Sequence, residues 1–197
     1  MSAPRPPKIA CVLLAAGGST RLGRPKQLVR RRGVPLVVRA AEAAVPVVDG
    51  PVVAVLGAEA LRLRGVLRRR AAPVRVVVNA RWADGLAGSL AAGLAALPAD
   101  TRAVLILLAD QPEVGPEALA RLIDAWRRHP ARAAASLYGG RAGVPAILPH
   151  RLFRAARTLD GDRGARALLR SLPDVTLVPM PEAALDIDTP DDLRRLR

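Results

Sequence analysis

The chain of 197 residues carries 31 Lys and Arg against 17 Asp and Glu, which gives a formal net charge of +14. This length suits one domain with a substantial core, and the core must be aliphatic because the chain holds only two Trp, one Tyr and one Phe. The basic residues are spread along the expected helices without aromatic stacking partners. We therefore expect no nucleic-acid partner, although a basic surface attracts a polyanionic substrate.

Targeting signals and cysteine chemistry are also excluded. No apolar segment reaches the ~20 residues that a membrane span requires. The apolar run at 9–16 follows Arg5 and Lys8, but it is short, and cleavage after it would remove the loop described below. Cys11 is the single cysteine, so we expect neither a disulfide framework nor a cysteine-based metal site. We expect a cytoplasmic protein that has no membrane partner.

Apolar runs alternate with amphipathic stretches along the chain, separated by Gly and Pro. The expected strands are residues 9–14, 51–56, 74–78, 103–108, 133–138, 144–148 and 175–178. The expected helices are residues 35–45, 59–70, 86–97, 116–129, 151–158, 165–172 and 189–196. Continuous apolar strands that alternate with helices predict an α/β fold, three-layered and Rossmann-like, around a mostly parallel central sheet. No repeat or linker interrupts residues 9–197, which we expect to form a single domain after a disordered tail at 1–8.

The first strand leads into the most informative segment, LLAAGGSTRLGRPKQL at residues 13–28. Glycines there allow a ligand to approach the backbone, and successive N–H groups can converge on an anion. Arg21 and Lys26 add two cations at the same place. The combination predicts a triphosphate site.

Three ligand-binding templates and one structural alternative compete for this loop. A P-loop requires Lys-Ser/Thr where Arg24-Pro25 stands, and a dinucleotide fingerprint requires G-x-G-x-x-G, which no frame supplies. A nucleotidyltransferase loop of the form L-A-A-G-x-S-x-R-x-G-x-x-K fits every signature position. A plain glycine turn between strand and helix is the structural alternative, and it leaves Arg21 and Lys26 unexplained.

Polar residues follow three of the expected strands at their carboxyl ends. Gly17, Asn79 and Asp110 each come directly after such an end. Because ligands of parallel α/β sheets collect at the carboxyl ends of the strands, we expect these positions to converge on one site.

Five motifs follow one another along the chain. They are the opening loop, Asn79-x5-Gly85-x3-Ser89-x3-Gly93, Ala109-Asp110-Gln111-Pro112, Gly161-Asp162-Arg163-Gly164-Ala165-Arg166 and Asp186-Ile187-Asp188-Thr189-Pro190. In this order they resemble the molybdopterin nucleotidyltransferase family of the nucleotide-diphospho-sugar transferase superfamily, in particular its molybdenum cofactor cytidylyltransferase branch. That branch carries alanine at the position of Ala16, where the guanylyl branch tends to glycine.

The resemblance implies a Mg²⁺-dependent nucleotidyltransferase fold and activity. The enzyme would move a CMP moiety from CTP to a phosphorylated acceptor, molybdopterin, and release pyrophosphate. Residues 9–130 would bind the nucleotide and residues 131–197 the acceptor. A molybdenum hydroxylase or its chaperone would be the protein partner.

The resemblance also assigns residues. Arg21, Lys26 and Asp110 would be catalytic, and Asp110 and Asp188 would hold Mg²⁺, which prefers carboxylate and phosphate oxygens. A turn-forming role for Asp110 and a helix cap at Asp188 are alternatives, and Asp186 could replace Asp188. The expected nucleotide-binding residues are Leu14, Ala15, Ala16, Gly17, Gly18, Ser19, Asn79, Gly85 and Ser89.

The expected acceptor-side residues are Gly161, Asp162 and Arg166, at the start of a helix whose amides could receive a phosphate. Asp162 as a simple helix cap is the alternative. Trp82 could stack on the nucleobase or pack beneath the loop. Val144 stands where the family usually carries asparagine, which leaves the acceptor open.

Four functions therefore remain to be distinguished. Besides cytidylyl transfer to molybdopterin, they are transfer with GTP or to a sugar or alcohol phosphate, an NAD(P)H-using reductase on the same scaffold, and a non-catalytic chaperone that hands molybdopterin to a partner enzyme.

Overall fold

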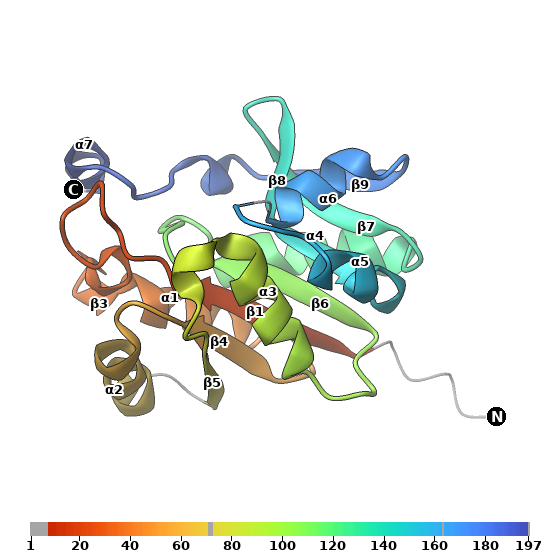
Figure 1. The fold of residues 1–197 in the computed structure, drawn as a ribbon. Helices are drawn as coiled ribbons and strands as arrows, with labels where there is room; N and C mark the ends of the chain where they lie inside the picture. Colours follow the sequence, from red (N-terminus) through yellow and green to blue (C-terminus); the bar gives the residue numbers. More distant parts are fainter. Residues whose placement is uncertain (1–7, 71–72, 163, 197) are drawn as a thin grey trace.

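The computed structural model describes residues 8–70, 73–162 and 164–196, which form a central sheet covered by helices on both faces (Figure 1). The sheet has seven strands in the order β5-β4-β1-β6-β8-β7-β9. Among the described strands of this sheet, only β8 runs antiparallel to its neighbours, β6 and β7. The predicted α/β fold with a mostly parallel sheet is confirmed. The strands are β1 Ile9–Ala15, β4 Val52–Leu56, β5 Val74–Val78, β6 Ala103–Leu108, β7 Ala133–Tyr138, β8 Arg141–Pro149 and β9 Val175–Pro179.

The helices occupy the expected segments with small differences. The α-helices are α1 Leu36–Ala44, α2 Ala60–Arg70, α3 Leu86–Ala95, α4 Pro116–Arg128, α5 Phe153–Arg157, α6 Ala165–Ser171 and α7 Pro190–Arg194. Single 3₁₀ turns lie at η1 Lys26–Leu28, η2 Trp82–Asp84, η3 His150–Leu152 and η4 Pro181–Ala184. The helix expected at 151–158 is divided between η3 and α5. The last helix starts one residue late because Thr189 is its N-cap, and the side chain of Thr189 accepts a hydrogen bond from the Asp192 N–H.

A two-stranded hairpin, β2 Arg30–Arg31 and β3 Val34–Pro35, was not expected from the sequence. Its two central residues have positive φ, 47° at Arg32 and 79° at Gly33, as hairpin turns of two residues require. Strands of two residues are too short to show an alternating hydrophobic pattern. The sequence pattern therefore did not predict this hairpin.

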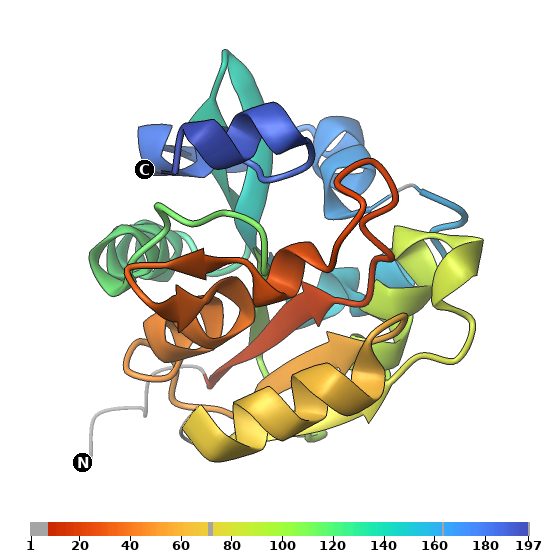
Figure 2. The ribbon, with the colours of Figure 1, turned by 90° about the vertical axis from the view of Figure 1, so that its left-hand side faces the viewer.

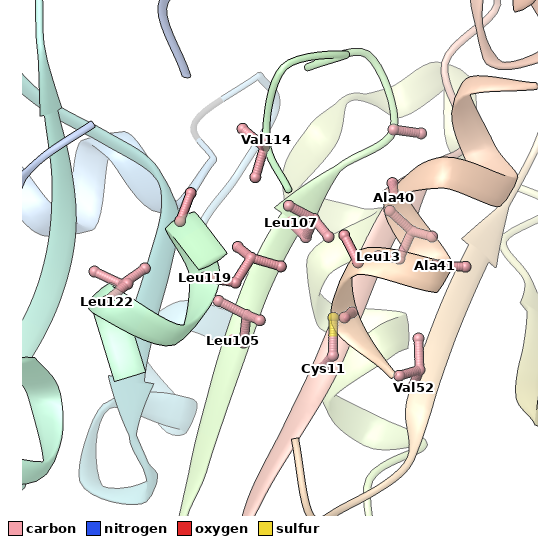
Figure 3. Packing of buried hydrophobic residues seen from close by; sticks show 14 of the residues in the cluster. Cys11, Leu13, Ala40, Ala41, Val52, Leu105, Leu107, Val114, Leu119 and Leu122 are labelled. Carbon is pink, nitrogen blue, oxygen red and sulfur yellow. The ribbon is translucent and has the colours of Figure 1, made fainter. Parts of the chain in front are cut away.

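Alternate residues of β1 serve two separate cores, one on each face of the sheet. Cys11 and Leu13 point to the side of α1, α2 and α4, where Figure 3 shows them between α1 and the side chains of β6 and α4. Val12 and Leu14 point to the opposite side, which α3, α5 and α6 cover. Because both faces are buried, the strand is apolar throughout, and burial raises the pKa of the Cys11 thiol.

The loops after β1, β5 and β6 gather at one edge of the sheet, and the C-terminal segment returns across it (Figures 1 and 2). The Ile187 N–H donates to the Asp110 carbonyl at 3.0 Å, and Ile187 packs in a small apolar cluster with Leu22 and Leu36. These contacts bring residue 188 beside the first loop.

At the other end of the sheet, Lys8 forms an ion pair with Asp100 at 2.9 Å. Residues 1–7 of the tail expected to be disordered lie outside the described residues. No helix in the described ranges is long and apolar enough to cross a membrane.

Candidate active site

The loop after β1 is folded back on itself by two polar side chains. Gln27 is 2% exposed, and its Nε2 donates to the carbonyls of Ala15 at 3.2 Å and Gly17 at 2.7 Å. The Ser19 hydroxyl accepts from the Lys26 N–H at 3.0 Å, and Ser19 itself has a positive φ of 56°. These hydrogen bonds fold the loop back, so that Lys26 lies opposite the carboxyl end of β1.

Lys26 lies between two carboxylates. Its Nζ is 2.5 Å from Asp110 Oδ2 and 2.7 Å from Asp188 Oδ1, and Arg21 adds a contact of 2.9 Å to Asp188. Burial opposes the charge of the Lys26 ammonium group, but the two carboxylates outweigh this effect and raise its pKa. Burial likewise opposes the charge of Asp188, while Lys26 and Arg21 hold the pKa of that carboxyl below its usual value.

Two further carboxylate oxygens are buried without a hydrogen-bond partner in the described part of the chain, Oδ1 of Asp110 and Oδ1 of Asp186. Burial and the negative charge of Asp110 raise the pKa of Asp186 to about 6. Buried acceptors without donors are costly, and a cation would satisfy them.

The carboxylates of this site fit a Mg²⁺ ion whose remaining ligands come from phosphates and water. Across the described ranges, no group of three or more His, Cys, Asp or Glu side chains could hold a metal ion by itself. Mg²⁺ is commonly bound by one or two carboxylates while phosphates and water complete its octahedron. Asp110 and Asp188, which lie together around one ammonium group, supply such a pair. The residues therefore fit a Mg²⁺ that arrives with a nucleotide.

These residues lie in a cavity of about 540 Å³ at the edge of the sheet. Eleven of the residues predicted from the sequence line it: Leu14, Ala15, Ala16, Gly17, Arg21, Lys26, Gly85, Ser89, Asp110, Asp162 and Asp188. Thr20, Gln27, Trp82, Ala83, Leu86, Leu108 and Ala109 complete the lining. The convergence expected at the carboxyl ends of β1, β5 and β6 is present.

Four predicted residues support the cavity from behind. Asn79 Nδ2 donates to the hydroxyl of Ser89 at 3.1 Å, which orients a side chain that is only 2% exposed. Ser19 holds the loop, as described above. Gly18 and Gly161 provide space for neighbours, because a Cβ on Gly18 would lie 3.0 Å from the Trp82 ring and the Gly161 carbonyl lies against Gly85.

Trp82 packs against the first loop, which is one of the two roles considered for it, and stacking on the nucleobase stays a prediction. Its indole lies on two glycines, since a Cβ on Gly57 would come within 2.5 Å of it, and it also lines the cavity. Trp82 thereby connects the first loop with the segment after β5.

Arg166 does not line the cavity. Its guanidinium bonds the hydroxyl of Tyr138, lies 5.7 Å from the centre of that ring, and is 3.6 Å from Asp186. The neighbouring Gln111 donates from Nε2 to the carbonyls of Val144 and Ala183, both at 2.9 Å. Sequence reasoning missed Gln27 and Tyr138, because their partners are backbone carbonyls or residues distant in sequence.

Comparisons with known proteins decide the family. The model of the MobA-like NTP transferase domain matches residues 11–175. The chain belongs to the MobA-like NTP transferase family. The predicted resemblance is confirmed at this level, and the family and its fold make the protein a nucleotidyltransferase.

Individual relatives of this MobA-like chain differ in name. Nicotine blue oxidoreductase of Paenarthrobacter nicotinovorans is 37% identical over 202 residues, which cover 96% of this chain and 97% of that protein. The crystal structure of Rv0371c from Mycobacterium tuberculosis H37Rv has a TM-score of 0.80 at 31% identity and covers 97% of this chain and 98% of its own.

A second structure of Rv0371c, described as a complex with manganese, has a TM-score of 0.77 at 29% identity. The match covers 96% of this chain and 97% of the Rv0371c chain. Molybdopterin-guanine dinucleotide biosynthesis protein A of Archaeoglobus fulgidus shares the fold, with a TM-score of 0.70 at 19% identity over 95% of this chain and 96% of its own.

Proposed function

We propose that this MobA-like protein transfers a CMP moiety from CTP to the phosphate of molybdopterin and releases pyrophosphate, with Mg²⁺ as its cofactor. The observation that carries the proposal is the placement of Lys26 between Asp110 and Asp188 at the mouth of the glycine loop. Cations and carboxylates at one strand edge match the needs of a reaction between two polyanions.

The residues of the cavity have distinct roles in this reaction. Arg21 and Lys26 bind the triphosphate, while the backbone of the loop from Leu14 to Gly18 lies against it. Asp110 and Asp188 would hold Mg²⁺, which would supply positive charge to neutralise the phosphates. An oxygen of the acceptor phosphate forms a bond to the α-phosphorus, and the bond to pyrophosphate breaks. The acceptor phosphate is already anionic near neutral pH, so no general base is needed.

The preference for CTP over GTP is supported by Ala16, a cavity residue at which the guanylyl branch tends to glycine. Ser89 and Gly85 would face the nucleoside. On the acceptor side, we assign residues 131–197, with Gly161 and Arg166 as elements of that half. The two halves share one cavity, because Asp162 and Asp188 reach it from the second half.

The setting follows from the activity. We propose that the protein acts in the cytoplasm and delivers its product to a molybdenum hydroxylase or to a chaperone of that enzyme. A GTP-using or sugar-phosphate-using transferase would need the same phosphate site and a different nucleoside or acceptor contact.

One observation favours a second candidate, an NAD(P)H-using reductase, namely the 37% identity to a protein named as an oxidoreductase. The loop lacks the G-x-G-x-x-G fingerprint of dinucleotide binding, which weighs against this candidate. A change in nicotinamide fluorescence at micromolar protein would support this candidate, and its absence would remove it.

The deciding experiment measures pyrophosphate release with Mg²⁺ and CTP, GTP, ATP or UTP, each with and without molybdopterin from a hydrolysed molybdoenzyme. Release that needs both CTP and the pterin is the expected result. Release with CTP and a sugar or alcohol phosphate alone would replace the acceptor. Binding of molybdopterin without any release would favour the chaperone function.

A further inference from the structure

Two segments that are distant from each other in the sequence form one wall of the cavity. The Ala87 N–H, in the first turn of α3, donates to the carbonyl of Gly161 at 3.0 Å. The Gly161 N–H in turn donates to Asp160 Oδ1 at 2.8 Å, and the Gly164 N–H donates to the Asp162 carbonyl at 2.9 Å. The loop before α6 is therefore fastened to the start of α3 and is itself tightly turned.

This packing depends on glycine on both sides. A Cβ on Gly85 would lie 2.3 Å from the Gly161 carbonyl oxygen, and Gly85 has a φ of 117°. A Cβ on Gly164 would lie 2.5 Å from the Leu86 side chain. A side chain at Gly85 would separate the loops because it meets backbone atoms, whereas one at Gly164 would require the Leu86 side chain to move. The close packing at Gly85 and Gly164 therefore positions Asp162 at the cavity wall.

Asp162 lines the cavity next to Gly85, because a Cβ on Gly85 would lie 2.9 Å from the Asp162 backbone N. The phosphate-binding cations are engaged elsewhere, since Lys26 pairs with Asp110 and Asp188 and Arg21 pairs with Asp188. In the described ranges, neither cation forms an ion pair with Asp162. Asp162 is exposed, and it lines the cavity without pairing with the cations that we assign to the triphosphate.

We propose that Asp162 is a specificity-determining residue for the nucleoside, not a contact for the acceptor phosphate. This inference rests on the proposed function, because a nucleotide must occupy the cavity. A carboxylate only accepts hydrogen bonds, so Asp162 selects a nucleoside group that donates them. A ribose hydroxyl and the exocyclic amine of cytosine both have this chemistry, whereas uracil lacks the amine.

The direction in which Asp162→Asn changes nucleotide affinity distinguishes a carboxylate that contacts the nucleoside from one that only lies near the triphosphate. A carboxylate that merely lies near a bound triphosphate repels it, and Asp162→Asn would then tighten the binding of every nucleotide. A carboxylate that accepts a charge-assisted hydrogen bond strengthens binding, and the same substitution weakens it because the amide oxygen of Asn accepts the bond without the negative charge. We expect CTP affinity to fall about tenfold, equivalent to about 1.4 kcal/mol.

The test is calorimetric titration of CTP, UTP and 2′-deoxy-CTP with Mg²⁺ into the wild type, Asp162→Asn and Asp160→Asn. Asp160→Asn is the matched control, because it removes a charge from the same loop and keeps the oxygen that accepts from Gly161. Weakened CTP with unchanged UTP identifies the base amine as the donor. Weakened CTP and UTP with unchanged 2′-deoxy-CTP identifies the ribose 2′-hydroxyl.

Other results overturn the inference. If Asp162→Asn binds all three nucleotides as tightly as the wild type, or more tightly, the role of Asp162 is wrong while the proposed function stands. An equal loss in Asp160→Asn would attribute the effect to loop charge and would also overturn it. If the wild type binds no nucleotide, the proposed function fails as well.

Discussion

The ammonium group of Lys26 lies 2.7 Å from the carboxylate of Asp188, although 162 residues separate them in the chain. The contact forms because the C-terminal segment returns across the sheet edge and pairs its Ile187 N–H with the Asp110 carbonyl. Lys26 thereby stabilises two carboxylates that would otherwise repel each other. If Asp110 and Asp188 hold a metal ion as proposed, that ion and Lys26 compete for them.

This competition predicts that Lys26→Met strengthens metal binding while it abolishes transfer. Without the ammonium group, the two carboxylates are free to bind a divalent cation. We expect the affinity for Mn²⁺ in the absence of nucleotide to rise roughly tenfold. Electron paramagnetic resonance of free Mn²⁺ measures this affinity directly, without any need for activity.

The matched control is Arg24→Met, which removes a cation of the same loop that makes no ion pair in the described ranges. Its Mn²⁺ affinity should stay within about twofold of that of the wild type. Weaker Mn²⁺ binding by Lys26→Met would contradict the competition and would make Lys26 an organiser of the metal site.

Asp110→Asn should remove transfer with little effect on the fold. The backbone bond from Ile187 to the Asp110 carbonyl does not involve the substituted side chain, so the C-terminal segment stays in place. Pyrophosphate release with CTP and Mg²⁺ should fall on the order of 10²-fold or more, because charge on the phosphates is no longer neutralised. Metal-free nucleotide binding should persist or tighten, and its loss would indicate a structural role instead.

The pKa of Asp186, raised to about 6, makes stability depend on pH in a defined direction. A folded-state pKa above the unfolded value of 3.8 stabilises the protein fully below about pH 4, and this contribution disappears as the pH rises through about 6. Between pH 4 and 7 the wild type should therefore lose up to about 2 kcal/mol relative to Asp186→Asn. Urea unfolding of both proteins at pH 4.5 and 7, without Mg²⁺, measures the difference.

Asp174→Asn serves as the charge control, because its carboxylate is exposed and pairs with Arg132 away from the cavity. The free-energy difference between this variant and the wild type should change much less over the same range. If Asp186→Asn follows the wild type at both pH values, Asp186 does not titrate in this interval.

The sheet and the convergence of loops at one of its edges were predictable because their determinants are local in sequence. Apolar runs located all seven strands of the central sheet, and their carboxyl ends brought Gly17, Asn79 and Asp110 to one edge. Arg21 and Lys26 belong to the loop that follows the first strand. The hydrophobic periodicity of the sequence and the geometry of a parallel sheet are sufficient to predict such features.

Contacts between distant segments were harder to predict. Asp162 was assigned to the acceptor side from the resemblance of its motif, and the sequence did not indicate that it would line a cavity shared with the first loop. The position of Asp162 depends on the packing of glycines between two loops. Hydrophobic periodicity in the sequence does not predict such contacts. Gln27 was overlooked for a related reason, since its partners are backbone carbonyls that every residue possesses.

Gln27 should therefore be more important than its sequence context suggests. Gln27→Leu keeps the volume but leaves the Ala15 and Gly17 carbonyls without their donor, at a cost of about 1–3 kcal/mol in the free energy of unfolding. Nucleotide affinity should fall in parallel, because the loop backbone contacts the phosphates. Gln27→Glu, which keeps the shape and removes the donor, should behave similarly, and undiminished stability in both variants would contradict this role.

Gly85 should tolerate no side chain, whereas Gly17 should tolerate one. In Gly85→Ala the new Cβ meets the Gly161 carbonyl in a backbone region with φ of 117°, so the two loops must separate. We expect a loss of about 2 kcal/mol or more in the free energy of unfolding, measured by urea denaturation. Gly17→Ala, where a Cβ would meet no atom within 4 Å, should change stability by less than about 0.5 kcal/mol. Equal stability of the two variants would mean that the loop before α6 is not held against α3, and Asp162 would then lose its position in the cavity.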